Sequence, residues 1–353
     1  MMMLHARTAL PLAGVVVLGC AAADRTVEDT PVTMEVMEPA LAHISAEGIL
    51  RRIEVLSHDS MEGRAPGTPG EDRTVRYLEA EFRAIGLAPG NPDGTYIQNV
   101  PLVGVTPRVT ATLQAGGRAI PLEGRTEYIA SSRRVAPEVR VENSDLVFVG
   151  YGVVAPEYDW DDYKDVDVTG RTIVMLVNDP GYATQDEALF RGNAMTYYGR
   201  WTYKYEIAAE KGAAAAIIIH ETGPAGYPFE VLSAGFEREN FEVRSADNNA
   251  GAVAVQAWMP EPAARRYMEQ LGHDFDALKA AALQRDFQPV ELGGQVSFVL
   301  QQQLRDVDSR NVVAKLEGGR RPDEYIVYTA HWDHLGIGPP DATGDSIYNG
   351  ALD

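Results

Sequence analysis

Apolar stretches between residues 140 and 220 constrain the fold more than any other feature of this 353-residue sequence. Two of them, "DLVFVGYGV" (145–153) and "RTIVMLVND" (171–179), are rich in β-branched residues, and Gly170 and Pro180 flank the second. Continuous apolar runs of this length are typical of strands that are buried on both faces. They therefore predict two interior strands of a covered sheet.

The next segment, "GRWTYKYEIAAEKGAAAAIIIHE", predicts a helix followed by a third strand. Tyr205, Ala208 and Gly212 recur at spacings of three and four, which gives a helix with one apolar stripe. We expect the helix to end at Gly212 and to pass into a strand over 213–219. Strand, helix and strand in this order describe an α/β module, and the turn residues around it place the module at 135–262.

Earlier in the chain, apolar residues at helical spacing predict two helices between residues 41 and 87, carried by Ile49, Ile53 and Leu56 and then by Val75, Leu78, Phe82 and Ile85. Gly86 is expected to cap the second helix at its C-terminal end. The polar segment "HDSMEGRAPGTPGED" (58–72) lies between the helices. Its glycines and prolines predict an ordinary surface loop.

A cluster of two histidines and one aspartate, "HWDH" (331–334), lies near the end of the sequence. "NVVAKLEG" (311–318) predicts a strand, and after a turn Tyr325–Ala330 predicts a second strand that ends at the cluster. Because open α/β sheets bind ligands at the carboxyl ends of their strands, this position predicts a functional site.

Imidazole and carboxylate groups together suit zinc. In an extended segment His331 and Asp333 point the same way, so His331 can bind a metal while Asp333 accepts a hydrogen bond from the other ring nitrogen. Asp353 follows a glycine-containing loop and can return to the same place. For His334 two interpretations stay open, a solvent-exposed loop residue or a residue that faces substrate.

Composition narrows the function classes. The formal net charge of −20 argues against a nucleic-acid partner, because the phosphate backbone would repel such a surface. The single cysteine, Cys20, excludes an intramolecular disulfide and leaves the folded body without a thiol nucleophile. The length predicts two or more domains.

The first 40 residues predict an export signal and a tether. Residues 1–19 have a short basic start and an apolar stretch too short to span a bilayer, as in a signal peptide. The sequence "VLGC" resembles a bacterial lipobox, which would leave a lipid on Cys20; a plain signal peptide cleaved in the "CAAA" region is the alternative. Both predict a periplasmic or cell-envelope protein, anchored to the outer membrane if Cys20 is lipidated. Residues 20–40 predict a tether without a core.

Four segments, in this order, resemble the co-catalytic zinc exopeptidase family of bacterial aminopeptidases, which also includes glutamate carboxypeptidase-like enzymes. They are "LSHDSMEGRAPGTPGEDRTVRYLEAEFRAIGLAPG", "GRWTYKYEIAAEKGAAAAIIIHETGPAGYP", "SRNVVAKLEG" and "YTAHWDHLG…NGALD". The resemblance covers nearly everything from residue 41 onward.

This resemblance implies an α/β fold, an incomplete α/β/α sandwich with a mixed sheet and an inserted β-rich α/β protease-associated domain. Residues 41–134 would be the N-terminal part of the peptidase domain, 135–262 the inserted domain, and 263–353 the start of the catalytic core. In the family the inserted domain is thought to cover the active-site mouth or shape substrate access. An insert without ligand contacts is the alternative.

The resemblance also implies roles for three residues. His331 matches the first zinc ligand, Asp333 the carboxylate that orients it, and Asp353 the aspartate that bridges two zinc ions. The family's Glu-Glu pair, a further acidic ligand and a final histidine follow the bridging aspartate. We therefore expect residues 1–353 to be an inactive, truncated part of an exported aminopeptidase that acts on peptides.

Two other functions remain open at this stage. One is a non-catalytic, receptor-like interaction protein of the same fold, and the other is a carboxypeptidase-type member of the family. The sequence predicts neither the substrate-binding residues nor the oligomeric state.

Overall fold

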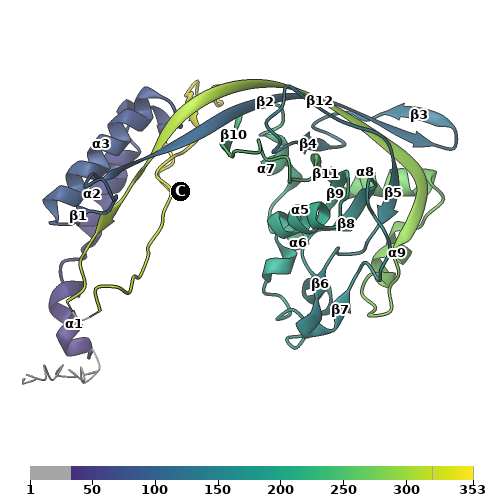
Figure 1. The fold of residues 1–353 in the computed structure, drawn as a ribbon, viewed down its shortest axis with the longest axis horizontal. Coiled ribbons are helices and arrows are strands. Elements are labelled where there is room, and N and C mark those ends of the chain that lie inside the picture. The colour runs from purple at the N-terminus through teal and green to yellow at the C-terminus, as the bar shows by residue number, and fades with distance from the viewer. Residues whose placement is uncertain (1–32, 320, 353) are drawn as a thin grey trace, which may run out of the picture.

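The computed structural model describes residues 33–319 and 321–352 of the chain. Figure 1 shows two regions, a helical one at one end and a sheet with helices at the other, joined by two long strands. The predictions for the signal peptide (1–19), for Cys20 and for Asp353 concern residues outside this described part. Within it, no helix is long and apolar enough to cross a bilayer.

Three helices form the first region, α1 (Met34–Leu41), α2 (Ala46–Leu56) and α3 (Pro69–Ala84). The two predicted helices are thus confirmed as α2 and α3. Ser45 caps α2 by accepting a 3.0 Å hydrogen bond from the amide of Gly48. Gly86 has a φ of +83° just after α3, the left-handed conformation expected of a C-terminal capping glycine.

The tether predicted over 20–40 ends in a helix, α1 (Met34–Leu41), in a stretch whose sequence shows no helical period. No residue of α1 is buried, so the helix makes no core of its own. Its Met and Glu residues favour helix in the absence of packing, which explains why a search for an apolar stripe misses it.

The prediction of a plain surface loop between α2 and α3 is wrong. Residues 59–64 form a 3₁₀ helix, η1 (Asp59–Arg64), in which Met61, Gly63 and Arg64 are buried. A Cβ atom at Gly70 would lie 2.3 Å from the carbonyl oxygen of Met61, so the backbone of α3 lies directly against η1. Glycines that allow close backbone approach, rather than apolar side chains, bury this segment.

A nine-stranded mixed sheet forms the second region and confirms the predicted fold class. The strands are β2 (Ile97–Ala115), β3 (Arg118–Pro121), β4 (Ile129–Ser131), β5 (Glu138–Phe148), β8 (Thr172–Leu176), β9 (Ala215–His220), β10 (Asn240–Val243), β11 (Val255–Pro260) and β12 (Val290–Val312). Their order is β10-β2-β12-β5-β8-β9-β11-β4, and β3 pairs with β2. The inner strands β5, β8, β9 and β11 are parallel, and the remaining pairs are antiparallel.

The predicted strand–helix–strand unit is confirmed as β8, α5 (Trp201–Glu210) and β9. Every residue of β8 and β9 is buried. Val174 and Ile217 line a space beneath helix α8 (Glu261–Gln270), so by alternation Met175 and Ile218 face the opposite side of the sheet. Since all four are buried, both faces of the sheet are covered.

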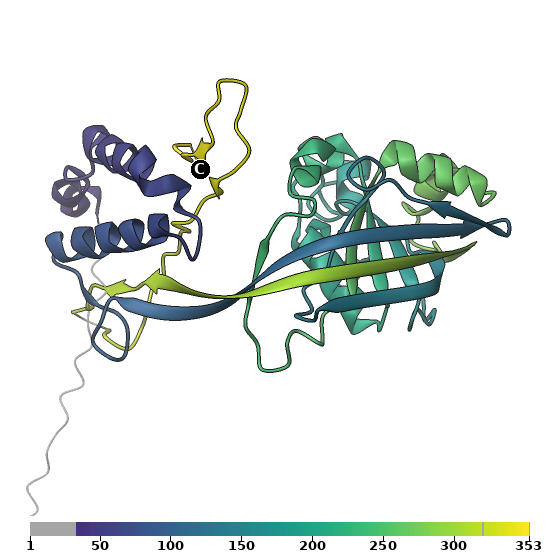
Figure 2. The ribbon, with the colours of Figure 1, turned by 90° about the horizontal axis from the view of Figure 1, so that it is seen from above.

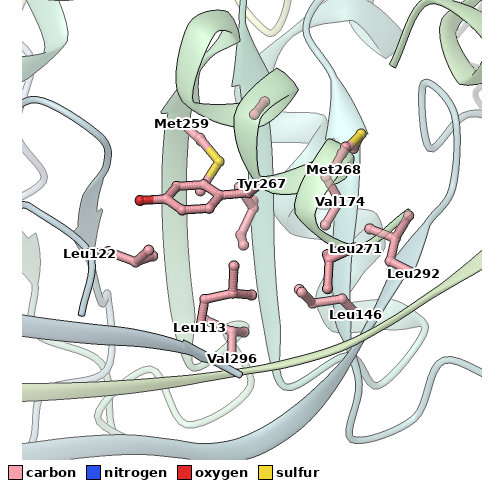
Figure 3. Close-up of a pocket in the computed structure, with 12 residues that line it drawn as sticks. Leu113, Leu122, Leu146, Val174, Met259, Tyr267, Met268, Leu271, Leu292 and Val296 are labelled. Carbon is pink, nitrogen blue, oxygen red and sulfur yellow. The ribbon is translucent and has the colours of Figure 1, made fainter. Parts of the chain in front are cut away.

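A small apolar cavity of about 40 Å³ remains between the sheet and α8. Figure 3 shows Leu113 and Val296 on one side of it and Tyr267 of α8 on another. The hydroxyl of Tyr267 donates a 2.6 Å hydrogen bond to Glu127. The lining is apolar, so the cavity offers no partners to a water molecule. It is a packing defect of a hydrophobic core.

The shorter elements connect these parts, namely α4 (Pro180–Thr184), α6 (Thr222–Ala225), α7 (Phe229–Ser233), α9 (Phe275–Ala281), η2 (Pro156–Tyr158), η3 (Tyr197–Gly199), β6 (Val154–Ala155) and β7 (Trp160–Asp161). The sheet extends past the expected limits of the inserted domain, residues 135 and 262. Strands β2 and β4 precede these limits and β12 follows them, yet all three pair within the same sheet.

Strands β2 and β12 also link the two regions. They pair continuously from Gln114↔Gln295, inside the sheet, to Ile97↔Val312, beside the helices. Figure 2 shows this two-stranded ribbon running from one region to the other. Beyond it, β1 (Ala88–Pro89) pairs with β13 (Ala314–Lys315) near α3.

The prediction of a strand over Tyr325–Ala330 is wrong. This segment has no strand pairing, and its apolar side chains are open to solvent, with Ile326 84% and Tyr328 91% exposed. A strand needs a neighbour that supplies hydrogen-bonding groups, and none of the described strands lies beside this one. The next strands are β14 (Gly336–Ile337) and β15 (Ile347–Tyr348), which pair with each other.

Candidate active site

The backbone of Glu62, Gly63 and Arg64 forms a left-handed turn at the end of η1, with φ values of 50°, 65° and 55°. Gly63 is required there, because a Cβ atom would lie 2.4 Å from the carbonyl oxygen of Gly336 and 2.7 Å from that of Tyr348. The turn therefore lies directly against β14 and β15. Glu62 and Arg64 adopt a conformation that costs energy for residues with a side chain.

The side chain of Arg64 joins two segments that are far apart in the sequence. Its Nε donates a 2.9 Å hydrogen bond to the carbonyl oxygen of Trp332, and its Nη1 donates a 2.7 Å bond to that of Asn349. Nη2 donates a 3.3 Å bond to the carbonyl oxygen of Gly350. In return the amide of His334 donates a 3.2 Å bond to the backbone carbonyl of Arg64. The histidine cluster and residues 349–350 thus converge on one arginine.

His331 and Asp333 lie next to each other at this place. Nδ1 of His331 is 3.5 Å from a carboxylate oxygen of Asp333 and 2.9 Å from the backbone oxygen of the same residue. Both side chains are partly open to solvent. Asp353, predicted to join them, lies outside the described residues, so its approach stays a prediction.

The structure does not decide between the two interpretations of His334, a solvent-exposed loop residue or a residue that faces substrate. A Cβ atom at Gly350 would lie 2.6 Å from Cδ2 of His334, so the imidazole ring rests against the backbone of Gly350. The side chain is neither fully exposed nor fully buried. Its ring therefore packs within the same convergence of segments.

A second network of polar side chains connects the histidine cluster to the start of α3 and the end of β12. The carboxylate of Glu71, which is 0% exposed, accepts 3.1 Å hydrogen bonds from Ser309 Oγ and from Arg310 Nε. The ring nitrogen of Trp332 donates a 2.9 Å bond to the backbone oxygen of Arg310. Arg310 also hydrogen-bonds to Asp72 and lowers the pKa of that carboxyl below its usual value. The start of α3, the end of β12 and the histidine cluster are therefore held together.

Sequence reasoning missed Arg64 and Glu71 because both lie in the segment interpreted as a loop. A signal for them was present in "EGRAPGTPGED", where three glycines interrupt a polar stretch of eleven residues. Glycines in such a stretch indicate close backbone approach, and charged side chains beside them can then be buried by hydrogen bonds to the backbone. Neither clue identifies the partners, which lie more than 230 positions away.

The donors at this place are of the types that zinc accepts, an imidazole and carboxylates. Among residues 33–319 and 321–352, however, no group of three or more histidine, cysteine, aspartate or glutamate side chains could hold a metal ion. Of the three residues predicted to form the site, the described part of the chain contains His331 and Asp333, which lie side by side.

Known proteins resemble this chain in two respects, in the sequence of its last segment and in its overall structure. Residues 311–353 match Peptidase family M28. No curated protein sequence matches the chain.

Among solved structures, the chain is similar to the aminopeptidase from Aneurinibacillus sp. strain AM-1, with 20% identity, a TM-score of 0.34, and coverage of 78% of this chain and 49% of that one. It is also similar to a Peptidase M28 precursor from Shewanella amazonensis SB2B, with 16% identity, a TM-score of 0.31 and coverage of 83% and 60%. A third similar structure is that of BSAP, a zinc aminopeptidase from Bacillus subtilis, with 14% identity, a TM-score of 0.29, and coverage of 78% of this chain and 48% of that one.

The chain therefore spans about half the length of the two aminopeptidases. The matched segment begins at the end of β12 and contains the histidine cluster and three residues whose carbonyl oxygens bind Arg64, namely Trp332, Asn349 and Gly350. Residues 311–353 are thus the part of the chain in which a likeness to Peptidase family M28 is found.

Proposed function

We propose that the intact gene product is an exported, metal-dependent exopeptidase of the aminopeptidase type, which removes N-terminal residues from peptides. One observation carries this proposal, the match of residues 311–353 to Peptidase family M28, because the same segment contains His331, Asp333 and Asp353. The 3.5 Å approach of Asp333 to the His331 ring nitrogen supports it.

In this proposal His331 and Asp353 would hold zinc, with Asp353 shared between two ions, and Asp333 would orient the imidazole of His331. The metal would supply Lewis acidity for a scissile carbonyl and would lower the pKa of a water molecule. The contribution of the chain itself is to present Nε2 of His331 to the metal, because Nδ1 faces Asp333. Export, and a lipid anchor at Cys20, belong to the same proposal and rest on the sequence alone.

A polypeptide of residues 1–353 should be inactive by itself. A catalytic zinc site needs about three protein ligands for each ion, and the described residues contain no such group. The same polypeptide should bind zinc weakly through His331 and Asp353.

The test uses the intact gene product and aminoacyl-anilide substrates. We expect hydrolysis that a chelator abolishes and added zinc restores, and loss of turnover in His331→Ala and in Asp353→Asn. Asp333→Asn should lose about 10–100-fold, as expected of a residue that orients a ligand. His334→Ala is the matched control and should retain much of the activity.

Peptides with a blocked N-terminus separate the aminopeptidase type from the carboxypeptidase type. An aminopeptidase releases nothing from them, whereas a carboxypeptidase shortens them from the other end. Activity that is insensitive to the chelator, or full activity in Asp353→Asn, would refute the two-zinc proposal.

A further inference from the structure

We propose that Arg64 is a positioning residue that assembles the metal site, by holding the histidine cluster and the segment that leads to Asp353 at one place. This inference rests on the proposed function, because it assumes that a metal binds at this site. The arrangement of the two segments can nevertheless be tested in the absence of metal. Arg64 itself touches neither substrate nor metal in this proposal.

The first argument is the set of acceptors. The guanidinium group donates to four backbone carbonyl oxygens, those of Leu56, Trp332, Asn349 and Gly350. Leu56 ends α2, whereas the other three lie on either side of β14 and β15. One planar group with five N–H donors can serve all these acceptors together, which the three donors of a lysine ammonium group cannot reproduce.

The second argument is burial. Only 6% of Arg64 is exposed, so its partly buried hydrogen bonds are shielded from much of the solvent on the arginine side, and bonds from a charged donor are stronger than neutral ones. Removing the guanidinium group would leave several partly buried carbonyl oxygens without this donor. The segments that carry them would then gain freedom to separate.

The third argument is the strained backbone that presents this side chain. Arg64 has a φ of 55°, and Gly63 before it permits contact with the backbone of β14 and β15. Strain of this kind persists only where the surroundings hold it in place, and it gathers at functional sites. Here it directs a buried arginine toward the two segments that carry the candidate ligands.

The two segments also pair with each other through β14 and β15, and further side chains hold each of them separately. Asn349 adds a 2.7 Å bond from its own side chain to the backbone of Ser57, which ties the second segment to the end of α2. Trp332 is tied to β12 through Arg310. Arg64 is the residue that bonds to both segments directly.

The experiment compares Arg64→Ala and Arg64→Lys with Arg52→Ala in the intact gene product. Arg52 is a matched control, because it is a hydrogen-bonded arginine on α2 whose partners, Glu81 and Gly48, lie in the helical region. Hydrogen exchange of residues 329–337 and 345–352 reports the order of the two segments without metal. Titration with zinc, and the absorption spectrum with Co²⁺, report the metal site without using activity.

We expect both Arg64 variants to exchange faster in the two segments and to bind zinc about 10–100-fold more weakly, the loss typical of residues that orient ligands. Millimolar guanidinium chloride should restore part of the zinc affinity of Arg64→Ala, by filling the vacated site, and should leave Arg64→Lys unchanged. Arg52→Ala should match the wild type in exchange and in affinity.

Wild-type exchange rates and zinc affinity in Arg64→Ala would overturn the inference. Faster exchange over the whole chain, sheet included, would also overturn it, because Arg64 would then act on folding in general. If the wild type binds no zinc, the proposed function fails, and faster exchange confined to the two segments of Arg64→Ala still supports the positioning role.

Discussion

The sheet region and the site region contain equally apolar stretches, but only the sheet region buries them. Every residue of β8 and β9 is buried, whereas Tyr325 and Val327 are each 77% exposed. The difference lies in the neighbours, since β8 and β9 pair with strands on both sides and 325–330 pairs with none of the described strands. An apolar pattern indicates what a segment can form, and a partner decides whether it forms.

The groups that are buried differ in kind as well. In the site region the least exposed side chains include Glu71, Thr74 and Arg64, which are held by hydrogen bonds, while Ile49 and Ile85 of the neighbouring helices remain 52% and 59% exposed. In the sheet region most buried side chains are apolar, and Asp162, Asp179 and Lys204 are among the exceptions. We therefore expect substitutions that remove side-chain volume to destabilise the sheet region most. Substitutions that break contacts to the backbone should affect the site region most.

The largest effect should come from Phe148→Ala. Phe148 is 0% exposed on β5 and its ring lies 5.9 Å from that of Phe287, so its removal leaves a large cavity. We expect a loss of about 3–5 kcal/mol in the free energy of unfolding, measured by urea denaturation. Val243→Ala, on the exposed side of β10, is the control and should stay within about 0.5 kcal/mol. A change below about 1 kcal/mol in Phe148→Ala would contradict a tightly packed core.

Asp162→Ala tests one of the buried polar groups of the sheet region. Its carboxylate accepts hydrogen bonds of 2.9 Å from the amide of Val153 and 2.8 Å from the ring nitrogen of Trp160. Alanine would leave both donors buried without a partner, which should cost about 2–3 kcal/mol in the same assay. The exposed Asp286 serves as the control, and a similar loss in Asp286→Ala would attribute the effect to charge rather than to these bonds.

Gly63→Ala examines the site region directly. The new Cβ atom would meet two carbonyl oxygens and force the turn away from β14 and β15, at a cost of about 1–3 kcal/mol. We expect faster hydrogen exchange over 331–337 and 347–350, with no change in the sheet. Gly86→Ala has a similar positive φ but nothing within 4 Å, so it separates backbone strain from the close contact. Equal effects in the two variants would rule out the contact as the cause.

The smallest effect should be a dependence of stability on pH through His220. Burial lowers the pKa of His220 below its usual value of 6.5, and Nε2 has no hydrogen-bond partner. His220 therefore binds a proton more readily in the unfolded chain than in the folded protein. The contribution of neutral His220 to the free energy of unfolding is complete above pH 6.5 and is lost as the pH falls below that value. The thermal midpoint of the wild type should therefore drop more than that of His220→Phe between pH 7.5 and 5.5.

The comparison with His220→Phe is needed because Asp162 titrates in the opposite sense. Burial raises the pKa of Asp162 to about 7, so its protonated form adds stability at low pH that is lost as the pH rises through 7. Both proteins share this contribution, and it cancels in their difference. Identical pH profiles for the two proteins would mean that His220 is not buried in its neutral form.

Prediction from the sequence succeeds better in the sheet region than in the site region. Strands β8 and β9 and helices α2, α3 and α5 could be predicted because their local patterns agree with their surroundings. The placement of His331 beside Asp333 could be predicted from their spacing, whereas their role at a metal stays a prediction. Arg64 and Glu71 could not be predicted, because their roles depend on carbonyl groups and side chains more than 230 positions away. The strand predicted at 325–330 fails for the related reason that pairing is not a local property.

The pairing of β2 with β12 has a consequence for the time course of synthesis. Gln98 and Asn311 bond across the ribbon although they are 213 positions apart in the chain. At about 5–20 residues per second, β2 waits roughly 10–40 s for this partner. Throughout that interval its edge can pair with another chain, so newly made molecules are exposed to aggregation before the ribbon closes. A nascent chain that stalls before residue 290 keeps that exposed edge for as long as it survives.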